Sequence, residues 1–284
     1  MAKGSAMGLW KGKKGSSVFY QIKNTNSAQK QGIRERNYEP SNPKSARQAS
    51  QRMRMFPAQA VYGVLKDTIE RSWQGVKYGQ MTRQAYLKAA LRSEFFPAVS
   101  KGAGMIVPGP YQIAKGTLNE VATTIEEDGG CIFDLTTGGS VVDFFSTVAD
   151  VSTDLLASND WLKEGDQLTF VICYTKDPAV VSFIWSTVSF YINTSDTTQL
   201  ADLFPNAAGF VRANGGGLKI DWPGDEYVYA GACIVSREGT TPLRSNATLS
   251  VNAAALPDYY GATARAKAQR SYMKALTVQS TDWP

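Results

Sequence analysis

The residues best suited to chemistry in this sequence are basic, and they are densest near its amino terminus. Residues 41–54 have the sequence SNPKSARQASQRMR, with four Lys or Arg and no Asp or Glu. Guanidinium and ammonium groups without acidic neighbours suit phosphate oxygens and other anions. The sequence therefore predicts a nucleic-acid or anion-binding surface, for which the candidates are Lys11, Lys13, Lys14, Arg34, Arg36, Lys44, Arg47, Arg52 and Arg54. The alternative is the solvated side of an ordinary helix.

Catalysis finds little support in the residue types. Histidine is absent from all 284 positions, which removes Ser-His-Asp and Cys-His catalysis and His-ligated zinc. The three cysteines, Cys131, Cys173 and Cys233, lie among apolar neighbours, so we expect buried free thiols. The acidic runs IEEDGG and WPGDEY lack the ligand spacing of a calcium loop and are typical of solvated turns. We expect no catalytic residue, no metal and no cofactor, and hence not an enzyme.

Charge is segregated along the chain. Residues 1–101 hold 19 Lys and Arg against 5 Asp and Glu, a net charge of +14. Residues 102–258 hold 7 against 19, a net charge of −12, and residues 259–284 hold 4 against 1, a net charge of +3. Such an asymmetry indicates a polyanionic partner or a self-assembling surface. It is also compatible with two parts of one chain that pack on each other or on neighbouring copies.

The basic run is predicted to lie on a helix. Asn42 suits an N-cap and Pro43 suits the first helical position. On a helical wheel, an apolar stripe forms from Ala46, Ala49, Met53 and Phe56. Lys44, Arg47, Gln48 and Gln51 fall opposite this stripe, with Arg52 and Arg54 on its flanks.

Two further helices are expected before residue 97. Pro57 is predicted to break or restart the first helix, and residues 58–73 place Val61, Leu65, Ile69 and Trp73 at i, i+4 spacing. A third helix is expected from an N-cap at Thr82. Upstream, residues 16–22 and 30–38 alternate like the strands of a β-hairpin.

Beyond residue 100, short β-rich runs alternate with turn clusters. The runs include QLTFVICYT, VVSFIWSTVSFYI and YVYAGACIVS, as well as SVVDFFSTV at residues 140–148. This pattern predicts an antiparallel β-sandwich, immunoglobulin-like in type, and residues 262–276 predict a short C-terminal helix. The expected fold class is α+β, with a basic hairpin-helix module at 1–100, an acidic β-sandwich at 101–258, and a basic helix and tail at 259–284.

No segment approaches the ~20 apolar residues that span a bilayer, and no apolar core follows the basic amino terminus. We therefore expect a protein that is made in a bacterial cytoplasm and has no membrane partner.

The amino-terminal segment resembles a family of uncharacterised proteins from Bacteroidota and their bacteriophages. In that family, a strand similar to GKVGNVVYY and a second strand lead into NPRTxxQxxQR. The matching positions here are Gly12, Gly15, Val18, Tyr20, Asn42, Pro43, Gln48, Gln51 and Arg52. The late segment YAGACIVSREGTTPLRSNATLSV is similar to the strand-turn-strand that closes the same family's β-domain.

The resemblance implies a structural protein of a phage virion, located in the particle, and we expect it to form a homo-oligomer. The resemblance supplies no catalytic residue. We expect partners among other copies of the chain, other virion proteins, and DNA or RNA. The alternative is a free nucleic-acid-binding protein without sequence specificity.

Overall fold

The chain divides into two compact units, residues 1–43 and residues 44–284. The computed structural model describes residues 3–4, 10–14, 17–21, 31–35, 46–127, 130–138, 146–175, 182–204, 209–212, 217–221 and 227–277. The first unit holds an antiparallel sheet in the order β1-β2-β3-β4. Its strands are β1 (Lys3–Gly4), β2 (Trp10–Lys14), β3 (Ser17–Gln21) and β4 (Gln31–Glu35).

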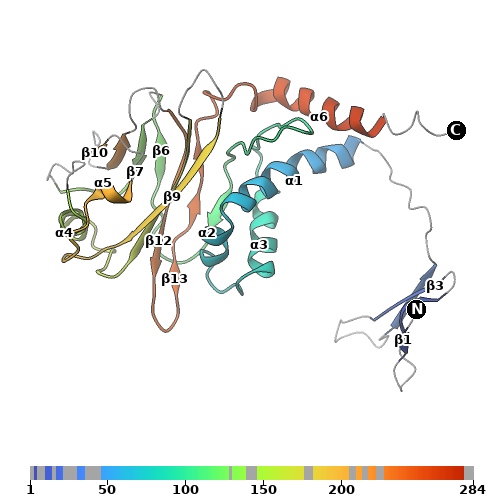
Figure 1. Ribbon diagram of the computed structural model, residues 1–284, viewed down its shortest axis with the longest axis horizontal. Coiled ribbons are helices and arrows are strands. Elements are labelled where there is room, and N and C mark those ends of the chain that lie inside the picture. Colours follow the sequence, from blue (N-terminus) through green and yellow to red (C-terminus); the bar gives the residue numbers. More distant parts are fainter. Residues whose placement is uncertain are drawn as a thin grey trace. The chain divides into compact units, whose positions relative to one another are not determined.

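The described part of the second unit contains a four-stranded and a five-stranded antiparallel sheet (Figure 1). One has the order β10-β11-β7-β6, formed by Gly209–Arg212, Leu218–Asp221, Cys131–Phe133 and Thr123–Ile125. The other has the order β13-β12-β8-β9, formed by Leu243–Arg244, Tyr227–Arg237, Gln167–Thr175 and Ile184–Tyr191. β15 (Ser250–Val251) also pairs with β12, and β14 (Ala247–Thr248) pairs with β5 (Gln112–Ala114). The prediction of antiparallel sheets is confirmed.

The central strands β8 and β12 are buried on both faces, which explains their nearly continuous apolar sequences. Phe170 and Cys233 face a core that combines side chains of both sheets. Val171 and Ile234, on the opposite face, belong to a second core beneath the helices. Close packing also explains Gly231, where an added Cβ would lie 2.6 Å from the sulfur of Cys131.

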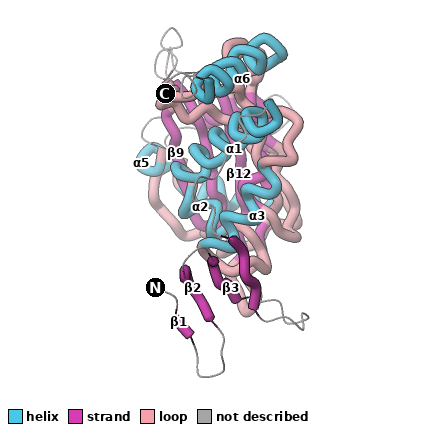
Figure 2. The backbone as a smooth tube through the Cα atoms, turned by 90° about the vertical axis from the view of Figure 1, so that its right-hand side faces the viewer, coloured by secondary structure: helices cyan, strands magenta, loops and turns pink. Residues whose placement is uncertain are grey.

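Helices α1, α2 and α3 cover one face of the five-stranded sheet (Figures 1 and 2). They span Ala46–Val64, Lys66–Arg71 and Gln80–Ala90. The predicted stripe of Val61, Leu65, Ile69 and Trp73 is buried in this core, as expected. Because these helices pack on the strands, they belong to the same compact unit, whereas the sequence placed a boundary near residue 100.

Two predicted helix boundaries are wrong. α1 continues through Pro57, which is itself buried, because packing of the surrounding turns offsets the lost backbone hydrogen bond. α3 begins two residues before Thr82, after Gly79, whose φ of 92° favours glycine. Thr82 is buried inside the helix and donates its hydroxyl hydrogen bond to the Lys77 carbonyl at 2.9 Å.

The segment predicted as a strand at 140–148 ends at the start of a helix. α4 (Val148–Ser158) begins at the N-cap Thr147, and its capping box includes Asp150. Residues 139–145 lie outside the described residues. α4 and the short α5 (Leu200–Leu203) pack on the core between the two sheets. The predicted C-terminal helix is confirmed as α6, Gly261–Thr277.

Candidate nucleic-acid or anion interface

The nine predicted binding residues fall in both units of the chain. Lys11, Lys13 and Lys14 lie on β2, and Arg34 lies on β4. Lys13 and Arg34 both pair with Val18 of β3, so the two positions share one level of the sheet. Arg36 and Lys44 lie outside the described residues. Arg47, Arg52 and Arg54 all lie on α1.

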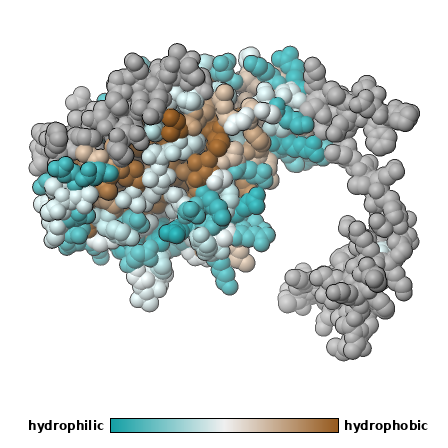
Figure 3. Space-filling model, viewed as in Figure 1, coloured by the Kyte–Doolittle hydropathy of each residue, from teal (hydrophilic) through white to brown (hydrophobic). Residues whose placement is uncertain are grey.

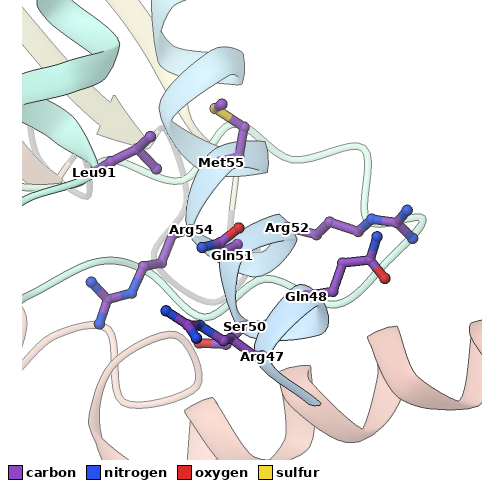
Figure 4. A pocket seen from close by; sticks show the side chains of 8 residues that line it. All are labelled: Arg47, Gln48, Ser50, Gln51, Arg52, Arg54, Met55 and Leu91. Carbon is purple, nitrogen blue, oxygen red and sulfur yellow. The ribbon is translucent and has the colours of Figure 1, made fainter. Parts of the chain in front are cut away.

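The three α1 arginines line one open hollow of about 710 Å³ (Figure 4). The other lining residues are Gln48, Ser50, Gln51, Met55 and Leu91. The lining residues that the structure describes include no Asp or Glu, so every charged side chain among them is basic. Figure 4 shows Arg52 and Gln48 extending to one side of α1, and Arg54 to the other.

The side chains of Arg47 and Arg52 are exposed, and neither side chain makes an ion pair or hydrogen bond with the described part of the chain. Arg47 also lies in the first turn of α1, which contains no acidic residue. A cation there opposes the helix dipole, at a cost of about 0.3–1 kcal/mol. A bound anion would reverse the sign of this interaction, because it would attract both the side chain and the backbone N–H groups.

Arg54 has a different environment. Its guanidinium carbon lies 4.7 Å from the centre of the Phe96 ring, and that of Arg265 on α6 lies 4.9 Å from the same centre. Phe96 itself is buried. Cation–π contacts of this kind contribute about 0.5–2 kcal/mol each. Arg54 therefore helps to hold α1, Phe96 and α6 together, and it is only partly exposed to a ligand.

α1 and α6 lie side by side, although about 200 residues separate them in the sequence (Figures 1 and 2). A separate apolar cluster joins them and consists of Ala49, Met53, Phe96, Ala98, Ala264, Ala268 and Tyr272. Four of these seven residues are alanines, which allow helix backbones to approach closely. The cluster confirms Ala49 and Met53 of the predicted stripe, whereas Ala46 and Phe56 are exposed.

The pairing of these helices concentrates positive charge. α1 contains three Arg, and α6 contains two Arg and two Lys, and neither helix contains an Asp or Glu. Arg47, Arg52, Lys267 and Arg270 are exposed. Figure 3 shows the hydrophilic residues over the start of α1 and along α6. We call these two helices together the α1–α6 basic surface; an extended polyanion would relieve the repulsion within it.

The cysteines and Glu126 are engaged in packing or pairing, whereas Asp128, Asp225 and Glu226 of the acidic runs lie outside the described residues. The prediction for the cysteines is confirmed, because all three are buried free thiols. Burial raises the pKa of Cys131 and Cys233 far above the usual range, which suppresses the reactive thiolate. Glu126, from the first acidic run, pairs with Lys219 at 2.7 Å. Within the described residues, no three His, Cys, Asp or Glu side chains form a group that could hold a metal ion.

Sequence reasoning missed the contribution of α6 to this surface. It identified a basic C-terminal helix, but it had no means of placing that helix next to α1. The available signal was the pair Ala264 and Ala268, an i, i+4 repeat of small residues in a helix without acidic side chains.

Comparisons with protein-family models, curated proteins and solved structures found no match to this chain. No helix in the described ranges has the length and apolar character needed to cross a membrane.

Proposed function

We propose that this chain is a non-enzymatic structural protein of a bacteriophage virion. In this proposal it assembles with other copies of itself or docks on other virion subunits. Its basic surface faces packaged nucleic acid or the acidic surface of a neighbouring subunit. The amino-terminal sequence resemblance and the segregation of +14 and −12 net charges along the chain support this assignment.

The observation that carries the proposal is the packing of α1 against α6. Two helices that lack any acidic residue lie side by side, and both keep exposed cations. Such an arrangement adds little to the stability of a single chain, because like charges repel at close range. It becomes favourable when a polyanion or an acidic protein surface covers it.

We also propose that the β-rich part of the second unit is an immunoglobulin-like sandwich, and that residues 16–38 form a hairpin. Two antiparallel sheets that share one apolar core support the first assignment. Antiparallel pairing of β3 with β4 supports the second. Sandwich domains of this kind provide rigid bodies with broad surfaces for contacts between subunits.

A second candidate function is a free nucleic-acid-binding protein without sequence specificity. The basic hollow on α1 favours it, because Arg47 and Arg52 are exposed there and have no acidic partner in the described residues. The two candidates differ in assembly. A structural protein forms defined oligomers at high concentration, whereas the free binding protein stays monomeric until nucleic acid is added.

The test combines sedimentation of the full chain over a range of protein concentrations with its binding to a random-sequence DNA duplex at several salt concentrations. The key variant is Arg52→Glu/Lys267→Glu. Its control is Lys115→Glu/Lys163→Glu, which makes the same charge change at exposed lysines elsewhere. The structural proposal expects concentration-dependent oligomers that the key variant weakens and the control does not.

A chain that stays monomeric at all concentrations, with or without DNA, and is missing from virions would contradict the structural proposal. A DNA affinity that does not change with salt concentration would exclude the second candidate function, since counterion release makes phosphate binding strongly salt-dependent.

A further inference from the structure

The five-stranded sheet presents a row of polar side chains on the face that the helices cover only in part. Along β8 this face carries Val171, Thr169 and Gln167, so it changes from apolar to polar toward the start of the strand. β12 changes in the same way from Ile234 to Ser236. The helices pack over the apolar half, whereas over the polar half they leave an open hollow.

β9 continues this polar surface. After Trp185, which belongs to the helix-side core, the same face carries Thr187, Ser189 and Tyr191. The register places Thr169 opposite Ser189, and it places Gln167 between Tyr191 on one side and Ser236 on the other. Neighbouring strands lie about 4.8 Å apart, so these side chains form one contiguous patch.

This patch is the floor of a hollow of about 460 Å³, which we call the polar hollow. Its opposite wall includes Asp67 and Arg71 of α2, and Arg244 of β13. In Figure 1 this is the region where α2 approaches the lower ends of β12 and β13. In Figure 3 the atoms over this region are mostly hydrophilic or intermediate.

The hydrogen-bonding groups on the floor are unused by the protein. Within the described residues, no hydrogen bond is made by the side chains of Gln167, Thr169, Thr187, Ser189, Tyr191 and Ser236. Ser236 is only 7% exposed, and it lines the hollow at the inner end of this row. Because these groups face the open hollow, water can satisfy them in the free protein, and a ligand that enters must replace those hydrogen bonds.

The charges around the hollow indicate which kind of molecule fits. Asp67 and Glu238 balance Arg71 and Arg244, so the formal charge of the wall is zero. Arg244 is already engaged, since its guanidinium pairs with Glu238 at 2.6 Å and donates to the Arg71 carbonyl at 3.0 Å. This site therefore differs from the α1–α6 basic surface and has no preference for a polyanion.

We infer that the polar hollow binds a neutral oligosaccharide. A sugar ring carries hydroxyl groups that both donate and accept, as do the Ser, Thr and Gln side chains on the floor. The ring of Tyr191, which is 54% exposed, offers an apolar surface for the C–H face of a sugar. A few converging polar groups beside one aromatic ring are typical of a small-molecule site.

The test is the retention of the full chain on an array of immobilised neutral and anionic oligosaccharides, followed by calorimetric titration of the strongest neutral one. We expect binding to a neutral oligosaccharide that stays constant as salt rises, because no net charge is involved. Tyr191→Ala and Thr187→Val should each weaken this binding by about tenfold.

Two matched variants serve as controls. Tyr78→Ala removes another exposed tyrosine that does not line the polar hollow, and Ser186→Ala removes a hydroxyl from the opposite face of β9. Both should bind as the unmodified chain does. The inference is overturned if no neutral oligosaccharide is retained, if Tyr191→Ala binds normally, or if only anionic sugars bind and salt releases them.

This inference does not depend on the proposed virion function. The hollow shares no residue with α1 or α6, so Arg52→Glu/Lys267→Glu should leave sugar binding unchanged. Loss of sugar binding in that variant would instead place the ligand on the basic surface.

Discussion

Phe96 is the residue whose replacement tests most sharply how α6 is held to the body. Its ring is 4% exposed within the α1–α6 cluster, and the guanidinium carbons of Arg54 and Arg265 lie 4.7 and 4.9 Å from its centre. Phe96→Leu keeps an apolar side chain but removes both cation–π contacts. At about 0.5–2 kcal/mol for each of the two contacts, the expected loss is about 1–4 kcal/mol.

Phe96→Ala should cost more, about 3–5 kcal/mol, because it also leaves a cavity. The loss should appear as local opening, since the described side chains of α6 that are buried pack mainly in this cluster. Hydrogen exchange followed by mass spectrometry measures it directly. Exchange of the α6 amides should accelerate by about tenfold for every 1.4 kcal/mol lost.

The control for this experiment is Phe95→Ala, since Phe95 is 65% exposed and should not alter exchange in α6. A double variant, Phe96→Leu with Arg54→Met, should lose less than the sum of the two single changes, because both remove the same contact. Normal protection of the α6 amides in Phe96→Ala would show that Phe96 does not hold this helix on the body. If the losses of stability in the two single variants add up to the loss in the double variant, the cation–π contact between Arg54 and Phe96 contributes nothing measurable.

Three further predictions concern the body of the protein. Asp166→Ala should destabilise it by about 3–5 kcal/mol in denaturant titration, because the 1% exposed carboxylate accepts two hydrogen bonds of 2.6 and 2.7 Å from Arg237; a loss below about 1 kcal/mol would contradict this. Gly231→Ala should lower the melting temperature by several degrees, since the added Cβ would lie 2.6 Å from the Cys131 sulfur, and an unchanged value would show that the strand yields freely. Hydrogen bonds from the N-cap of α4 lower the pKa of Asp150, so its stabilising contribution is present above the unfolded pKa of about 3.9 and is lost as pH falls through the folded pKa. Asp150→Asn should therefore reduce the pH dependence of stability below about pH 4, and an unchanged acid titration of stability would count against the capping box.

The strands were predictable where burial dictates the residue type. β8 and β12 are buried on both faces, so their apolar runs are long and unmistakable, and the antiparallel sheets follow from the turn clusters between such runs. α6 was predictable from its composition and length. In these elements local preference and tertiary packing favour the same structure.

The errors arise where tertiary packing outweighs a local signal. Pro57 disfavours a continuous helix by about 3 kcal/mol, yet the packing of Met53, Ala58 and Val61 maintains α1 through it. α4 was missed because an apolar run was read as a strand up to residue 148. The T-x-x-D spacing of Thr147 and Asp150 was the signal for a helix start.

The candidate sites differ in how far the sequence alone could predict them. Arg47 and Arg52 were identified from charge alone, because no acidic residue lies near them in the sequence. The contribution of α6 depends on a contact across about 200 residues. The small-residue repeat of Ala264 and Ala268 indicates that α6 packs closely on something, but it does not identify α1 as the partner. The polar hollow depends on the register that brings Thr169 next to Ser189, and register is fixed by the packing of the whole sheet.

The central claim is that the α1–α6 basic surface faces a polyanion or an acidic protein surface. The most direct measurement places a photo-crosslinking residue at position 52 in the full chain, concentrates the protein with DNA, and identifies what is captured. We expect crosslinks to DNA or to residues 102–258 of another copy, at a yield well above that from the same group at position 163. Equal yields from the two positions, or capture of neither partner, would contradict it.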